Sequence, residues 1–247
     1  MRPVARAGAV IAGFGTATAA GAGVGLLHRD RRQGANLATS LGCDLALALA
    51  GVRLNVVGGQ YLWSHRPAVF IFNHQSSIDL PVVGSLLRRD VTGVACDPRV
   101  ALLGYLADVV YVDGDTAQAK EALAPVVDRL CEGVSIAIAP EGTRSPTPRL
   151  GRFKQGAFHM AMQGGAPIVP IVIRNAGEII RKGSLVIRPG TIDVAVLPPI
   201  PAEDWTVEQL DARIAELRRL YLDTLESWPC GGRGGRGGCA PAHHRSP

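Results

Sequence analysis

Aromatic residues and cysteines are scarce in this chain of 247 residues. Aromatic residues make up 5% of it, and the five cysteines include no C-x-x-C pair. An odd cysteine count without such spacing indicates neither a disulfide framework nor a zinc site. A reducing compartment is the simplest interpretation.

Basic stretches interleaved with aromatic residues, which are typical of nucleic-acid-binding proteins, are also missing. The formal net charge is +5, but the arginines are scattered along the chain. A basic balance attracts anions in general, including acidic headgroups and phosphorylated substrates. We therefore expect no nucleic-acid partner. The two Gly-Arg repeats near the C-terminus are too few to change this expectation.

Apolar residues are plentiful, at 47% of the chain. Residues 7–27 carry no charge and form a stretch about long enough to cross a bilayer as a helix. Arg2 and Arg6 precede this stretch, and Arg29, Arg31 and Arg32 follow it. Because positive charge tends to stay cytoplasmic, the basic cluster argues against an exported signal peptide. We favour a weak membrane anchor with the active site on the cytoplasmic side. A buried helix, a re-entrant helix and a surface-lying helix remain alternatives.

Apolar strand-like runs alternate with helix-like segments through the rest of the chain. Strands are expected at residues 52–58, 67–73, 93–96, 109–113, 134–140, 167–173, 184–190 and 191–200. Helices are expected at residues 35–52, 79–87, 99–108, 116–130, 155–163 and 206–227. This alternation predicts an α/β fold with a mixed, mostly parallel sheet flanked by helices.

Three segments are expected along the chain. Residues 1–34 form the apolar membrane-associating segment, and residues 35–228 form the main domain. Residues 229–247 are a Gly/Arg-rich tail whose composition cannot build a core, so we expect disorder there. At the start of the last helix, Thr206 and Gln209 have the spacing of a capping box. Leu210, Ile214, Leu217 and Tyr221 form its apolar stripe, and its arginines are interpreted as a solvated basic face.

His74 and Asp79 follow the apolar run of residues 67–73, five residues apart. If the turn is tight, the Asp79 carboxylate can reach the imidazole, fix its tautomer and leave the other ring nitrogen as a general base. Ser76 and Ser77 lie close by, but neither stands in a G-x-S-x-G elbow, so the base would activate a substrate hydroxyl. The alternative is that His74 caps a helix while Asp79 favours its N-terminal dipole.

A second cluster follows the strand expected at residues 134–140. The residues are APEGTRS at 139–145, and GRFKQG comes soon after at 151–156. Arg144, Arg152 and Lys154 could converge on one anion, and Gly142 allows close backbone approach. Glu141 could hold an arginine or a substrate hydroxyl. A solvated basic loop is the alternative, but together the two clusters imply a phosphorylated substrate whose hydroxyl is deprotonated.

Several ordered motifs resemble those of the PlsC-type lysophosphatidic acid acyltransferases, within the glycerolipid acyltransferases. N-H-x-x-x-x-D matches Asn73, His74 and Asp79, and E-G-T-R-S matches residues 141–145. F-K-x-G matches residues 153–156, and an apolar stretch around Pro170 matches the fourth motif. The chain also resembles the acyltransferase half of actinobacterial proteins that carry a phosphatase-like domain upstream.

The resemblance implies acyl transfer from acyl-CoA or acyl carrier protein to 1-acylglycerol 3-phosphate, with no metal, no cofactor and no acyl-enzyme. His74 and Asp79 would be catalytic, and the substrate would be bound by Glu141, Gly142, Thr143, Arg144 and Lys154. The partners would be membrane lipid, lysophosphatidic acid and the thioester donor.

The second family motif departs from the usual pattern, because Gly114 stands where the family has a basic residue. Lys120 or Arg152 could substitute for it. Acylation of another lipid alcohol and a catalytically impaired lipid-binding paralogue are therefore the alternatives.

Overall fold

The computed structural model describes residues 3–29, 31–95, 109–111, 119–144, 149–181, 183–184 and 186–229. Seven strands form one sheet in the order β1-β7-β6-β2-β5-β3-β4. The strands are β1 (Val52–Val57), β2 (Val69–Phe72), β3 (Val91–Ala95), β4 (Val109–Tyr111), β5 (Ser135–Ile138), β6 (Ile168–Arg174) and β7 (Gly190–Val196). All neighbouring pairs are parallel except β6 and β7. The predicted α/β fold with a mixed, mostly parallel sheet is confirmed.

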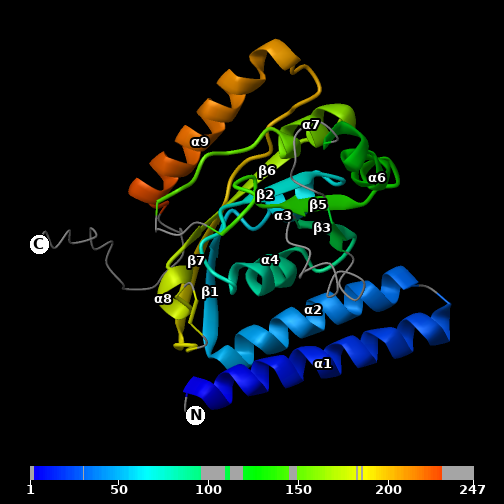
Figure 1. The fold of residues 1–247 in the computed structure, drawn as a ribbon, viewed down its shortest axis with the longest axis vertical. Helices are drawn as coiled ribbons and strands as arrows, with labels where there is room; N and C mark the ends of the chain where they lie inside the picture. Colours follow the sequence, from blue (N-terminus) through cyan, green and yellow to red (C-terminus); the bar gives the residue numbers. More distant parts are fainter. Residues whose placement is uncertain are drawn as a thin grey trace, which may run out of the picture.

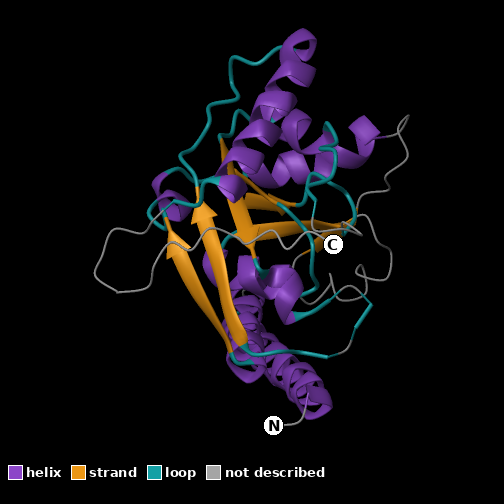
Figure 2. Cartoon of the chain, turned by 90° about the vertical axis from the view of Figure 1, so that its left-hand side faces the viewer, coloured by secondary structure: helices purple, strands orange, loops and turns teal. Residues whose placement is uncertain are grey.

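Helices cover both faces of the sheet (Figure 1). Those described are α1 (Pro3–His28), α2 (Arg31–Ala50), α3 (Tyr61–Ser64), α4 (Asp79–Leu87), α6 (Ala119–Cys131), α7 (Gly156–Gln163), α8 (Ala176–Ile179) and α9 (Leu210–Glu226). Helices α6, α7 and α9 lie on one side of the sheet, and α4 and α2 lie on the other, with α1 outermost (Figure 1). Figure 2 shows the same layers from the side.

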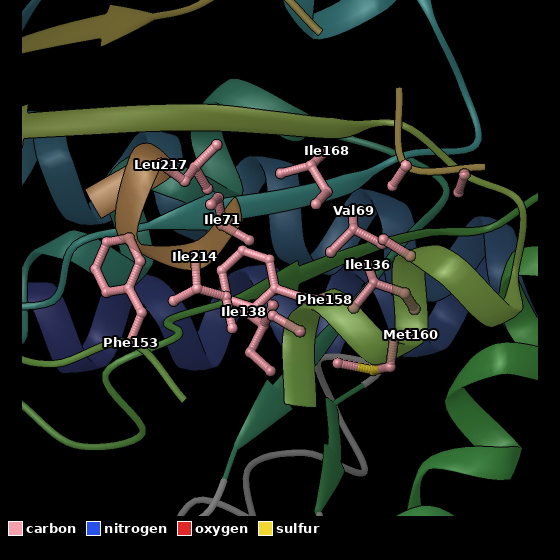
Figure 3. Packing of buried hydrophobic residues seen from close by; sticks show 14 of the residues in the cluster. Val69, Ile71, Ile136, Ile138, Phe153, Phe158, Met160, Ile168, Ile214 and Leu217 are labelled. Atoms are coloured by element: carbon pink, nitrogen blue, oxygen red, sulfur yellow. The ribbon is translucent and has the colours of Figure 1, made fainter. Parts of the chain in front are cut away.

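The central strand β2 is buried on both faces, as its continuous apolar run predicts. Because side chains alternate along a strand, Val69 and Ile71 face one layer of helices while Phe70 and Phe72 face the other. In the first layer they pack with Phe158 of α7 and residues of α9 (Figure 3). This double burial anchors the chain immediately before Asn73 and His74.

The two N-terminal helices form an antiparallel hairpin in which α2 packs on α4 (Figure 1). The helix expected from residue 35 begins at Arg31. A Cβ atom on Gly21 would lie 2.4 Å from the Gly34 carbonyl oxygen, so the two backbones meet where no larger residue fits. Helix α1 is long and apolar enough to cross a membrane, and most of it is exposed.

Two local predictions are wrong. Residues 186–189, the described end of the strand expected at 184–190, form no strand. Arg188 instead donates its N–H to the Ile179 carbonyl, and Pro189 has no N–H to offer a ladder. The capping box is also absent: Thr206 makes no side-chain cap, and a 3-10 turn (Val207–Gln209) precedes α9. The helix expected at residues 99–108 lies outside the described residues.

Candidate active site

Three adjacent parallel strands, β5, β2 and β6, bring their carboxyl ends to one edge of the sheet. Asn73 extends the pairing of β2 with β6 beyond the last strand residue. Its side-chain amide donates to the Ile173 carbonyl at 2.9 Å and accepts from the Ile173 N–H at 2.7 Å. The asparagine therefore fixes the chain direction at the residue before His74.

His74 and Asp79 are in contact, as the five-residue spacing predicted. The His74 Nδ1 atom lies 3.0 Å from Asp79 Oδ2. The same oxygen accepts the backbone N–H groups of Gln75 at 2.7 Å and Ser76 at 2.8 Å. With one oxygen, Asp79 therefore both closes the turn before α4 and orients the imidazole. The Asp79 side chain is 1% exposed and that of His74 is 14% exposed.

Helix capping does not explain His74. The N-cap residue of α4 is Ile78, and no side chain caps the helix there. An ionised carboxylate only accepts hydrogen bonds, so Nδ1 donates its proton and Nε2 carries the lone pair. Ser76 is not placed as a nucleophile, because its hydroxyl is buried and donates to the Ile180 carbonyl at 2.8 Å.

Glu141, just after β5, joins the two sequence clusters. Its Oε1 accepts the backbone N–H of His74 at 2.9 Å, and its Oε2 accepts that of Gly151 at 2.7 Å. The carboxylate is buried and thus holds backbone on both sides. Sequence reasoning expected Glu141 to hold an arginine or a substrate hydroxyl and missed these two bonds.

Lys154 lies against Gly142. The Gly142 backbone has φ +74°, and a Cβ atom there would lie 2.9 Å from the lysine Nζ atom. A side chain at position 142 would therefore be strained by this backbone conformation, and the end of the lysine would have to move aside. Thr143, Arg144 and Lys154 are exposed, as a site that receives an external anion requires.

One contact to this edge was not predicted at all. Arg218 of α9, which was interpreted as part of a solvated basic face, is half-buried and donates to the carbonyls of Leu150 and Gly151. The contact spans 67 residues of sequence, so no local pattern could reveal it. Only the position of Arg218 one turn before the apolar Tyr221 hinted at a partly buried place.

Gly114 and Ser145 of the predicted motifs lie outside the described residues, and nothing is described of the Lys120 side chain. In the part of the chain that the structure describes, no group of three or more His, Cys, Asp or Glu side chains could hold a metal ion.

Comparison with known proteins agrees with the motifs. Residues 53–174 match the acyltransferase family. The 1-acyl-sn-glycerol-3-phosphate acyltransferase alpha of Homo sapiens is 32% identical over 204 residues, which cover 76% of this chain and 69% of the human protein. The 1-acyl-sn-glycerol-3-phosphate acyltransferase of Limnanthes alba is 32% identical over 73% of this chain and 66% of its own length. The chain thus spans about two thirds of the curated relatives it matches.

A solved structure shares the fold. The 1-acyl-sn-glycerophosphate acyltransferase PlsC of Thermotoga maritima has a TM-score of 0.68 and is 22% identical, covering 85% of this chain and 90% of its own. The alignment therefore takes in nearly all of that protein. From its sequence relatives and its motifs together, the chain belongs to the acyltransferase family that contains the 1-acyl-sn-glycerol-3-phosphate acyltransferases.

Proposed function

We propose that this chain transfers an acyl group from a thioester to the free hydroxyl of 1-acylglycerol 3-phosphate and so forms phosphatidic acid. The observation that carries the proposal is the 3.0 Å contact between His74 Nδ1 and Asp79 Oδ2 at the end of the central strand. An imidazole oriented in this way is a general base without a protein hydroxyl to activate. The hydroxyl it activates then belongs to the acceptor.

The proposed mechanism is sequential: the acyl group passes directly from the thioester to the acceptor, without an acyl-enzyme. His74 Nε2 removes the proton of the acceptor hydroxyl as its oxygen attacks the thioester carbonyl. The buried Asp79 carboxylate stabilises the imidazolium that forms. Collapse of the tetrahedral intermediate breaks the C–S bond, and the imidazolium returns the proton to the leaving thiolate. No cofactor is needed, and acyl-CoA or acyl carrier protein supplies the thioester.

The acceptor phosphate is proposed to bind at the exposed basic side chains beside Gly142. Lys154 lies directly over Gly142, and Arg144 follows two residues later. Arginine suits the bidentate geometry of a phosphate, and lysine supplies a point charge. Glu141, whose oxygens both accept backbone N–H groups, holds the backbone on both sides of this site.

We further propose that α1 lies on the membrane with the active site on the cytoplasmic side. Helix α1 packs along α2, and α2 packs on α4, which carries Asp79. A helix held against the domain in this way is suited to the interface, where its exposed apolar residues can enter lipid. The arginines at both ends of α1 suit the cytoplasmic leaflet, whose anionic lipids attract basic residues.

The test is a panel of acceptors and donors with purified protein in mixed micelles. We expect phosphatidic acid from 1-acylglycerol 3-phosphate, with much slower use of glycerol 3-phosphate and of a lysolipid without the phosphate. Acylation of the phosphate-free acceptor at an equal rate would assign the enzyme to another lipid alcohol. Lipid binding without turnover by any donor would favour an impaired paralogue.

A further inference from the structure

The last helix, α9, reaches the active-site edge through the charged side chain of Arg218. Its Nε donates to the Gly151 carbonyl and its Nη2 to the Leu150 carbonyl, each at 2.9 Å. The guanidinium presents its donors in a rigid planar fork. Two bonds from one such fork to successive carbonyls fix both the position and the orientation of the turn that contains Leu150 and Gly151.

The turn that Arg218 holds is the one that holds Glu141. The Gly151 N–H donates to Glu141 Oε2 at 2.7 Å, and a Cβ atom on Gly151 would lie 2.7 Å from that same oxygen. The other oxygen of Glu141 accepts the His74 N–H at 2.9 Å. A continuous series of hydrogen bonds therefore runs from Arg218 through Gly151 and Glu141 to the backbone of His74.

Tyr221, one turn later on α9, fixes the helix against the same strands. Its hydroxyl donates to the Ile71 carbonyl at 2.7 Å and accepts the Ile171 N–H at 3.2 Å, bridging β2 and β6 just before the active-site turn. The Tyr221 ring also meets Phe153 edge-on, with ring centroids 5.3 Å apart. These contacts of Tyr221 hold α9 against β2 and β6, close to the turn that Arg218 contacts.

We propose that Arg218 is a positioning residue for acyl transfer, acting through Gly151 and Glu141 to hold His74 against its substrate. The inference rests on the proposed function, because it assigns a role within that reaction. A purely structural arginine would contribute to stability alone. A positioning arginine contributes to kcat in a way that depends on Glu141, because small displacements of a catalytic group cost large factors in rate.

The first comparison sets Arg218→Ala against Arg219→Ala, its exposed neighbour on the same helix. We expect Arg218→Ala to lower kcat by about tenfold or more with a smaller change in acceptor KM, and Arg219→Ala to leave both unchanged. Arg218→Lys retains the charge and one donor, so it should keep more kcat than Arg218→Ala. Equal kcat in wild type and a folded Arg218→Ala variant would overturn the proposal.

A double-mutant cycle with Glu141→Gln separates positioning from stability. The glutamine amide nitrogen cannot accept a backbone N–H, so this variant breaks the series on one side of Glu141. If Arg218 acts through Glu141, Arg218→Ala should cost less than about threefold in the Glu141→Gln background, because coupled sites are not additive. Fold-losses that multiply would mean that the two residues act independently, and the proposal would be wrong.

Hydrogen exchange supplies a readout that does not depend on activity. In Arg218→Ala the backbone N–H groups of Gly151 and His74 should exchange faster, while those of the buried strand β5 should be unchanged. Unchanged exchange at Gly151 and His74 would contradict the proposed series. A wild-type protein that forms no phosphatidic acid would instead overturn the proposed function, and the exchange result would still test whether Arg218 holds this turn.

Discussion

One carboxylate oxygen of Asp79 accepts three hydrogen bonds, because all three donors lie within the five residues before it in the sequence. The turn after β2 folds back so that Asp79 Oδ2 meets the N–H groups of Gln75 and Ser76 together with the imidazole of His74. Its other oxygen, Oδ1, is buried and has no hydrogen-bond partner among the described residues. One side chain thus stabilises the turn and orients the proposed base.

Asp79→Asn should lower kcat by about a hundredfold or more, because the neutral amide cannot stabilise an imidazolium. The amide oxygen can still accept the two backbone N–H groups, so the turn should persist. Steady-state acyl transfer measures the effect, and Ser77→Ala, an exposed neighbour, is the control. Near-normal turnover in Asp79→Asn would show that the carboxylate serves only the turn.

The sequence predicts the His74–Asp79 contact because both residues lie in one short turn between a strand and a helix. It does not predict how Glu141 and Arg218 are used. Glu141 bonds a backbone group 67 residues away, and Arg218 bonds carbonyls 67 and 68 residues away. Such contacts depend on how the sheet orders its strands, and this leaves no periodic signal.

At the scale of elements, the hydroxyl of Tyr221 is a buried link between α9 and two strands. Tyr221→Phe removes the donor to the Ile71 carbonyl and the acceptor for the Ile171 N–H. We expect a loss of about 1–3 kcal/mol in the free energy of unfolding, the cost of leaving buried polar groups unsatisfied. Denaturant unfolding at neutral pH measures it, and Leu222→Ala on the exposed face of α9 is the control.

Ionisation of the Tyr221 hydroxyl makes the stability difference between wild type and Tyr221→Phe depend on pH. Burial raises the pKa of Tyr221 well above its ordinary value of 10.0, because it outweighs the hydrogen bond from the Ile171 N–H, which lowers this pKa, and the Glu141 carboxylate adds to the rise. Near pH 10 the tyrosine ionises in the unfolded chain but not in the folded protein. The stability that the buried hydroxyl contributes is therefore complete below pH 10 and is lost as the pH rises toward the folded-state pKa. The difference between wild type and Tyr221→Phe should therefore shrink above pH 10, and a constant difference would contradict the assignment.

The hairpin of α1 and α2 depends on a glycine contact. A Cβ atom on Gly21 would lie 2.4 Å from the Gly34 carbonyl oxygen and 2.6 Å from the Ala38 Cβ atom, whereas Gly23 has nothing within 4 Å. Gly23→Ala should stabilise by up to about 1 kcal/mol, because alanine favours helix. Gly21→Ala should lower Tm, because the helices must separate. Thermal unfolding in detergent decides, and two shifts of the same sign would contradict this packing.

Most elements follow from hydrophobic periodicity, and the failures have local causes. The helix expected at residues 79–87 is α4 (Asp79–Leu87), and the buried run before His74 is β2. Residues 186–189 contain apolar side chains, but Pro189 has no N–H to offer a ladder and the Arg188 N–H donates to the Ile179 carbonyl instead. Thr206 has the residue type of a cap, but the chain enters α9 through a 3-10 turn instead.

At the scale of the whole molecule, α1 offers lipid an apolar face remote from α9. Ile11 is 73% exposed and Leu26 is 81% exposed, and α9 lies on the opposite side of the sheet (Figure 1). Replacing both residues by glutamate should lower binding to anionic vesicles by about tenfold or more, since each buried apolar side chain contributes about 1.5–3 kcal/mol. Leu222→Glu on α9 is the matched control, and equal binding by both proteins would place the membrane contact elsewhere.

The α/β class and the approximate strand positions could be predicted, but the strand order could not. The pairing of β1 with β7, which are separated by more than a hundred residues, has no counterpart in sequence periodicity. The limits of the three segments along the chain remain a prediction. The order matters for function, because it makes β2 the neighbour of both β5 and β6 and so brings the two motif clusters to one edge.

The central claim is that His74 removes the proton of the acceptor hydroxyl. The most direct measurement compares phosphatidic acid formation by wild type and His74→Ala, with 1-acylglycerol 3-phosphate and an acyl thioester as substrates. We predict that wild type forms phosphatidic acid and that kcat in the variant falls by at least about a hundredfold, the usual effect of losing a general base, with Tm nearly unchanged. A folded His74→Ala variant that turns over at close to the wild-type rate would contradict the account.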